Sequence, residues 1–171
     1  IARRLGNALV APVLAYVPEG GIDPPSGHML YPGTISLPDD VFIKVTEYAA
    51  RSFRANGFKN IVLIGDSGEN QKGLQSVANS LNKEWSKTNV RVHFVSEYYK
   101  ESAFREWLQG QGEKREDIGT HAGIVDTSQL MAVNPKGIRS DKLAAGGDRS
   151  ATGVTGNPAR ASAAYGKKGL E

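Results

Sequence analysis

Two short apolar runs separated by a helical pattern constrain the fold of this chain more than any other feature. The runs are Ile61–Ile64 and Val90–Val95, and apolar runs of this length are typical of strands buried on both faces. Between them, apolar residues recur at the spacing of one face of a helix: Leu74, Val77, Ala78, Leu81 and Trp85. A strand–helix–strand order joins parallel strands. We therefore predict an α/β fold with three layers, α/β/α, around a mostly parallel sheet.

The remaining segments continue this alternation. The apolar run Ala8–Tyr16 predicts another buried strand, although Pro12 favours an irregularity or an edge position. A helix is predicted from Pro38 to the stop signal Asn56-Gly57. Its apolar face would be Phe42, Val45, Ala49 and Phe53. Further helices are expected over residues 97–112, around residues 129–133 and from Asn157-Pro158 onward, and an exposed loop over residues 136–156.

The length of 171 residues suits one domain, which we expect to span residues 1–171. Ile1–Leu5 resembles the end of a helix that stops at Gly6-Asn7, so an N-terminal strand is expected to be missing. The net charge of +3 comes with scattered Lys and Arg, which argues against nucleic-acid binding, and no apolar stretch predicts a membrane span. There is no cysteine, which excludes disulfides and Cys-ligated zinc and leaves the compartment open.

Three polar clusters stand where a ligand site is expected. They are the Pro/Gly-rich loop of residues 18–34, the turn Gly65–Asn70 and the turn His121–Ser128. In open parallel sheets, ligands bind beyond the carboxyl ends of the strands. The sequence therefore predicts a site built from all three clusters.

The side chains in these clusters favour a cation. Asp66 and Glu69 offer carboxylate oxygens, and His28 and His121 offer imidazoles, which zinc and manganese accept. The alternative is a structural role for each: Glu69 favours the helix dipole, Asp66 caps the helix and the histidines bond to backbone.

Two other interpretations of the Gly65–Asn70 turn are weaker. Gly65-Asp66-Ser67-Gly68 is similar to the nucleophile segment of trypsin-like proteases. Those proteins are all-β, whereas this segment joins a strand to a helix. A glycine-rich turn at a helix N-terminus can also cradle phosphate, but Asp66 and Glu69 would repel it.

Four motifs in order resemble the creatininase (creatinine amidohydrolase) family. His28-Met-Leu-Tyr31-Pro-Gly-Thr-Ile-Ser-Leu37 is similar to the family's His-x-x-Phe/Tyr-Pro-Gly-Thr-Ile-Ser-Leu. Gly57-Phe-Lys-Asn-Ile-Val-Leu-Ile64 resembles the stretch before its Gly-His-Tyr-Glu-Asn turn. His121–Ser128 is similar to His-Ala-Gly-x-x-Glu-Thr-Ser, and Gly153–Pro158 to Gly-Val-x-Gly-Asp/Asn-Pro.

The resemblance implies an enzyme that hydrolyses a non-peptide C–N bond of a small cyclic or linear amide with a divalent metal, zinc or manganese. It implies that Glu69 binds metal, that His121 is an acid/base or oxyanion-stabilising residue, and that Asp126 orients His121. Asp66 is a further metal candidate. His28, Tyr31, Ser67 and Asn70 would line the substrate cleft. A homo-oligomer is expected by the same resemblance.

Two departures from the family pattern matter. Ser67 stands where the family has a metal-binding histidine, and the family's first metal motif would lie upstream of Ile1. These departures motivate the alternative function of a metal-deficient homologue that binds small molecules or has a structural role. The family is mostly cytoplasmic, and a signal peptide upstream of Ile1 would instead direct the protein to the periplasm or outside the cell.

Overall fold

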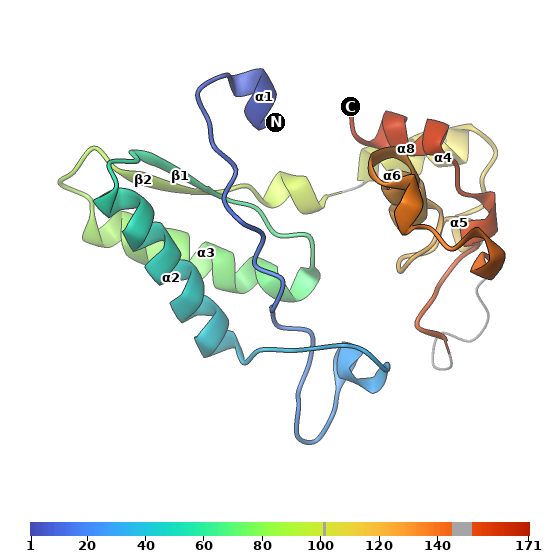
Figure 1. Ribbon diagram of the computed structural model, residues 1–171, viewed down its shortest axis with the longest axis horizontal. Coiled ribbons are helices and arrows are strands. Elements are labelled where there is room, and N and C mark those ends of the chain that lie inside the picture. Colours follow the sequence, from blue (N-terminus) through green and yellow to red (C-terminus); the bar gives the residue numbers. More distant parts are fainter. Residues whose placement is uncertain (101, 145–151) are drawn as a thin grey trace. The chain divides into compact units, whose positions relative to one another are not determined.

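The computed structural model describes residues 1–100, 102–144 and 152–171 (Figure 1). The chain divides into two compact units, Ile1–Ser96 and Glu97–Glu171.

The first unit holds the parallel strand pair that the sequence predicts. β1 (Asn60–Leu63) pairs in parallel with β2 (Arg91–Phe94), and Ile61 is opposite Val92. The helix between the strands makes the crossover that parallel neighbours require. The predicted strands over residues 61–64 and 90–95 are therefore confirmed, with bounds shifted by one residue. The α/β class is confirmed with them.

Two long helices pack against this strand pair (Figure 1). They are α2 (Asp39–Ala55) and α3 (Gly68–Glu84). The apolar face predicted for the second helix is confirmed: all five residues are buried, and Leu81 is 0% exposed. Burying one such side chain fully contributes about 1.5–3 kcal/mol. The core of this unit comprises Ala50, Ile61, Val77, Ala78, Leu81, Trp85, Val90 and Val92.

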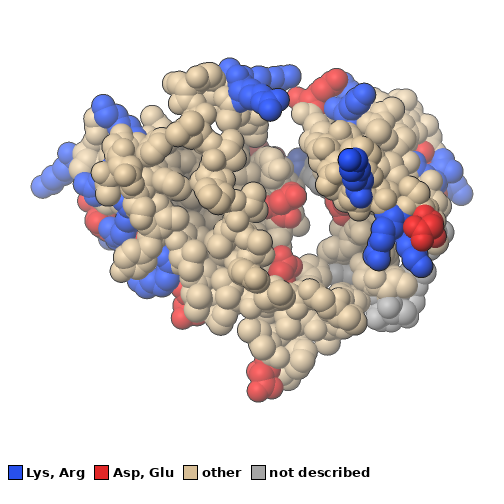
Figure 2. Space-filling view, viewed as in Figure 1, with Lys and Arg blue, Asp and Glu red and all other residues tan. Residues whose placement is uncertain are grey.

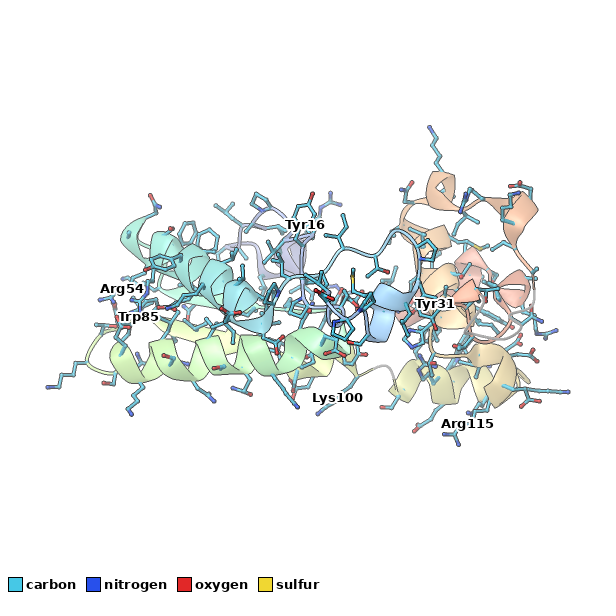
Figure 3. The ribbon with its side chains drawn as sticks, turned by 90° about the horizontal axis from the view of Figure 1, so that it is seen from below. Tyr16, Tyr31, Arg54, Trp85, Lys100 and Arg115 are labelled. Atoms are coloured by element: carbon cyan, nitrogen blue, oxygen red, sulfur yellow. The ribbon has the colours of Figure 1, made fainter. Side chains whose placement is uncertain are left out.

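Charged side chains connect the C-terminal ends of α2 and α3. Arg51 donates two hydrogen bonds to Glu84, at 2.8 and 2.6 Å, and these bonds lower the pKa of Glu84 to about 2. The guanidinium of Arg54 lies 4.7 Å from the centre of the Trp85 ring (Figure 3). These contacts cover the buried Trp85 at the C-terminal ends of both helices.

The face of α2 that packs inward agrees with the prediction at Phe42 and Phe53 and differs from it at Val45 and Ala49. Phe42, Thr46 and Ala50 are buried, whereas Val45 and Ala49 are exposed. Residues 42, 46 and 50 are one helical turn apart, so they form a single stripe. The prediction placed the apolar Val45 in the buried face. In the structure Thr46 is buried instead, because it lies between the buried Phe42 and Ala50 on the same face of the helix.

The predicted strand Ala8–Tyr16 is wrong. These residues form no strand with any described segment, and every one of them is exposed. Leu9 and Val10 are each 80% exposed and Val13 is 87% exposed. Val17, directly after the run, makes an isolated bridge with Ser36. Apolar composition identified the segment as a buried strand, but Pro12 lacks the N–H that a paired strand needs.

The second unit is helical over its described residues. α4 (Ser102–Gly110), α5 (Arg115–Ile118), α6 (Ile124–Val133) and α8 (Ala163–Gly169) surround a small core. That core comprises Phe104, Leu108, Ile118, Ile124 and Val125. Gly166 of α8 lies against the carbonyl of Ser128 in α6, so the two helices approach closely where no side chain separates them.

Several predicted bounds change. α1 (Ala2–Leu5) is helical and ends at Gly6 as predicted. The helix predicted over 97–112 is a 3-10 turn at Ser96–Tyr99 followed by α4. The helix predicted around 129–133 begins earlier, at Ile124. Asn157-Pro158 opens only a 3-10 turn, and Ser162 caps α8 instead by accepting from the Tyr165 N–H.

The loop predicted over 136–156 contains two 3-10 turns, Pro135–Gly137 and Ser140–Lys142. Its residues 145–151 lie outside the described part of the chain. Among the described residues, no helix is long and apolar enough to cross a membrane. On the face drawn in Figure 2, Lys and Arg occur in small groups, several of which have Asp or Glu beside them.

Candidate functional site

The predicted turn Gly65–Asn70 comprises the end of the link from β1 to α3 and the first three residues of α3, and one glutamine holds it. Gln71 donates from Nε2 to the carbonyls of Gly65 at 3.0 Å and of Ser67 at 2.8 Å. Ser67 occupies the N-cap position of α3, yet its hydroxyl makes no capping bond within the described structure. The local sequence thus produces the predicted strand–turn–helix, and Gln71 fixes the turn.

The four candidate residues of this turn differ in exposure. Asp66 and Glu69 are exposed and Ser67 is intermediate. Asn70 is buried at 7% exposure, and its Oδ1 has no hydrogen-bond partner among the described residues. Because a buried unpaired amide oxygen costs about 1–3 kcal/mol, this group is the most unusual polar atom of the turn.

Glu69 borders a hollow between the first turns of α2 and α3. The hollow has a volume of about 520 Å³. Its lining includes Asp39, Ile43, Glu69, Lys72 and Ser76. It is therefore a mixed acidic and basic surface within the first unit.

His28 lies in the long loop of residues 18–34 and faces a carboxylate. Its Nδ1 is 2.6 Å from Oε2 of Glu19. The side chain of His28 is 33% exposed and that of Glu19 is 21% exposed. Tyr31, labelled in Figure 3, ends the 3-10 turn that carries His28 by donating its N–H to the His28 carbonyl. His28 is thus a candidate site residue whose imidazole contacts a carboxylate.

His121 in the second unit is held through its backbone. Thr155 Oγ1 accepts from the His121 N–H at 2.9 Å and from the Thr120 N–H at 2.7 Å. The Thr155 N–H donates to the His121 carbonyl at 2.9 Å. Thr155 is 34 positions after His121 in the sequence. The backbone of His121 is therefore held by a residue that lies beyond residues 145–151.

Asp126 contacts the residue next to His121. Its Oδ2 accepts from the Ala122 N–H at 2.6 Å, and Thr127 donates from Oγ1 to the Ala122 carbonyl at 3.0 Å. Ala122 has φ +50°, a left-handed conformation that costs about 1–2 kcal/mol outside glycine. Asp126 therefore holds a strained backbone beside His121, and a role in orienting the imidazole itself stays a prediction.

An ion pair between Glu113 and Arg160 stabilises this unit. Glu113 is 4% exposed in its side chain and accepts from Arg160 at 2.6 and 3.1 Å. Tyr165 donates its hydroxyl to the same carboxylate at 3.1 Å. The Arg160 hydrogen bonds lower the pKa of Glu113, and the Glu113 carboxylate raises the pKa of Tyr165.

The predicted site residues thus fall into two groups. The first unit holds His28, Tyr31, Asp66, Ser67, Glu69 and Asn70, and the second holds His121 and Asp126. Sequence reasoning missed Glu19, Gln71 and Thr155. Thr155 stands at the variable position of the Gly153–Pro158 motif, so only its place in that motif could have indicated it.

The residues of the described structure do not assemble a metal site. Within residues 1–100, 102–144 and 152–171, no three His, Asp or Glu side chains gather closely enough to hold a metal ion. Catalytic zinc takes three protein ligands and a water. Asp66 and Glu69 are two carboxylates on one turn, which is fewer donors than such a site requires.

Solved structures of creatininases share this fold. The chain is 22% identical to a creatinine amidohydrolase (creatininase) crystal structure, with a TM-score of 0.78, covering 99% of this chain and 72% of that one. A creatininase mutant complexed with creatine matches with the same identity and TM-score, covering 99% of this chain and 73% of that one. A structure named creatininase Mn matches at 23% identity and a TM-score of 0.78, with coverage of 99% and 72%. A further structure of that same creatininase mutant is described as Zn-Zn type.

A search of the curated proteins found no match. The family model for creatininase, described as creatinine amidohydrolase, matches residues 1–171. With the α/β fold and the ordered motifs, this match defines the class of protein. The chain belongs to the creatininase family.

Proposed function

We propose that this chain is a hydrolase of a non-peptide C–N bond in a small cyclic or linear amide. The single observation that carries the proposal is the family match over residues 1–171, whose description is creatinine amidohydrolase. Amide hydrolysis requires a group that accepts a proton from water and a group that stabilises the oxyanion formed at the carbonyl.

His121 is the residue of this chain best suited to these tasks. The backbone N–H groups of Thr120, His121 and Ala122 already donate to Thr155 and Asp126. These N–H groups therefore hold the turn, and we propose that the side chain of His121 stabilises the oxyanion. An imidazole can do so when protonated and can move a proton when neutral.

The names of similar structures make zinc and manganese the metals to test. Asp66 and Glu69 are the candidate oxygen ligands of this chain. The described residues alone do not complete a ligand set for either metal.

The test is turnover by the purified full chain on a panel of creatinine, lactams, cyclic ureides and linear amides, with and without added Zn²⁺ or Mn²⁺. We expect His121→Ala to reduce turnover by about 10²–10⁴-fold, the usual contribution of a proton-transfer residue. His93→Ala is the matched control, because His93 is an exposed histidine of β2 that bonds to Asn60. No turnover on any amide, with or without metal, would refute the proposal.

Ser67 favours a second candidate function. In the family pattern a histidine stands there, and a hydroxyl is a poor zinc ligand. A homologue without metal chemistry would bind small amides without converting them. Calorimetric titration of creatinine and related amides that gives binding without product supports this candidate, and product formation excludes it.

We also propose a homo-oligomer with a small-molecule amide as its ligand, and neither nucleic acid nor membrane as a partner. Light scattering coupled to size-exclusion chromatography gives the mass in solution. A monomer mass at every concentration contradicts the oligomer.

A further inference from the structure

We propose that Glu19 is a positioning residue that fixes His28 in one tautomer and makes its Nε2 a hydrogen-bond acceptor for the ligand. The inference rests on the proposed function for the identity of the ligand, a small amide with an N–H donor or the water that attacks it. The contact that carries it is the 2.6 Å distance between His28 Nδ1 and Glu19 Oε2.

The chemistry of this contact sets the direction of the hydrogen bond. An ionised carboxylate only accepts, so the imidazole supplies the proton from Nδ1. In a neutral imidazole with Nδ1–H, the lone pair is on Nε2, which then accepts from an N–H or O–H. A carboxylate in this position commonly fixes the tautomer and orientation of a functional histidine.

The rest of the loop holds both partners of the pair. The Glu19 N–H donates to Ser36 Oγ at 2.9 Å, and the Ser36 hydroxyl donates to the Gly20 carbonyl at 2.8 Å. The His28 N–H donates to the Glu19 carbonyl at 2.9 Å, and Thr34 donates from Oγ1 to the His28 carbonyl at 2.9 Å. Ser36 is buried at 6% exposure, so the polar residues of the Pro-Gly-Thr-Ile-Ser segment fix the histidine and its carboxylate together.

Two glycines allow this close approach. Gly20 has φ +122° and Gly27 has φ +60°, backbone conformations that favour glycine. A Cβ on Gly20 would collide with the Ser26 carbonyl, and one on Gly27 would lie 3.3 Å from the Glu19 carbonyl oxygen. The loop therefore brings residues 19–20 against residues 26–28 only because these positions carry no side chain.

The test measures the tautomer directly and does not depend on activity. The chain has three histidines, so long-range ¹⁵N–¹H spectra of the full chain resolve each ring, and His28→Gln assigns its signals. We expect His28 as the Nδ1–H tautomer in the native chain, as a mixture or as Nε2–H in Glu19→Ala, and again as Nδ1–H in Glu19→Gln, whose amide oxygen still accepts. Asp23→Ala is the matched control, since Asp23 is an exposed acidic residue of the same loop.

An Nε2–H tautomer in the native chain, or an unchanged tautomer in Glu19→Ala, overturns the proposal. If Glu19→Ala does not fold, the tautomers of the native chain and of Glu19→Gln decide the question. If the chain hydrolyses an amide, Glu19→Ala should lower kcat/KM by about 10–100-fold, the usual effect of such a positioning group. Adding Glu19→Ala to His28→Gln should then cause no further loss, and an additive loss contradicts action through His28. If no amide is hydrolysed, the proposed function fails while the spectra still judge the Glu19–His28 pair.

Discussion

Replacing Thr155 with valine removes one hydroxyl while keeping the shape of the side chain. That hydroxyl accepts from two consecutive N–H groups, of Thr120 and His121, at 2.7 and 2.9 Å. The bond to Thr120 is exposed, so water can replace Thr155 there. The bond to His121 is partly buried, and its loss costs about 1 kcal/mol or slightly more because a donor is left unpaired. We therefore expect Thr155→Val to lower the free energy of unfolding by about 1–2 kcal/mol.

The assay is urea unfolding of the full chain, with amide hydrogen exchange at residues 120 and 121 as a local readout. Thr155→Ser is the matched control, because serine keeps the acceptor oxygen and should remain within about 0.5 kcal/mol of the native chain. Exchange at the His121 amide should accelerate in the valine variant and remain slow in the serine variant. Equal stability of the valine variant and the native chain would refute the reasoning, as would an equal loss in both variants.

Three further predictions concern the packing and the charges. The free energy of unfolding should fall as pH drops from about 4.5 toward 2. Glu84 and Glu113 have lowered pKa values in the folded chain, so they bind protons more readily when the chain is unfolded. Urea titrations at each pH measure this fall, and Glu113→Gln should remove part of the pH dependence. Gly166→Ala should destabilise by about 2–3 kcal/mol or more, because its Cβ would run into the Ser128 carbonyl where α6 and α8 meet; a melting temperature equal to that of the native chain would contradict this packing. Leu81→Ala should cost about 2–5 kcal/mol in chemical denaturation, because Leu81 is 0% exposed in the core of the first unit, and a loss below 1 kcal/mol would mean that the core is not packed as described.

The sequence predicts those parts of the fold that depend on local pattern. The apolar face of α3 repeats at helical spacing from Leu74 to Trp85, and all of these residues are buried. In α2, by contrast, an apolar Val45 lies next to Thr46, and the threonine is the buried one. Hydrophobicity alone cannot choose between neighbours when the packing of α3 and β1 sets the rotation of the helix.

The error at Ala8–Tyr16 has a different cause. An apolar run indicates burial only if another segment is available to pair with it and cover it. Residues 8–16 are exposed throughout the described structure. The composition of a segment reports its preference for burial and says nothing about its neighbours.

The same division applies to the candidate site. The turn Gly65–Asn70 is predictable because it lies between a strand and a helix that are adjacent in sequence. Glu19 and Thr155 were not predicted, because their bonds to His28 and His121 join residues 9 and 34 positions apart. Such contacts depend on the path of a loop, which here requires glycine at Gly20 and Gly27.

The left-handed backbone at Ala122 limits which mutations this position can accept. A β-branched side chain clashes in that conformation, while glycine and asparagine adopt it more easily. In a library that places every amino acid at residue 122, folded variants should therefore be rich in glycine, alanine and asparagine and poor in valine and isoleucine. The N–H of Ala122 bonds to Asp126, and its neighbour in the chain is His121. Backbone geometry therefore restricts which substitutions can accumulate beside the candidate catalytic histidine, before any selection for activity acts.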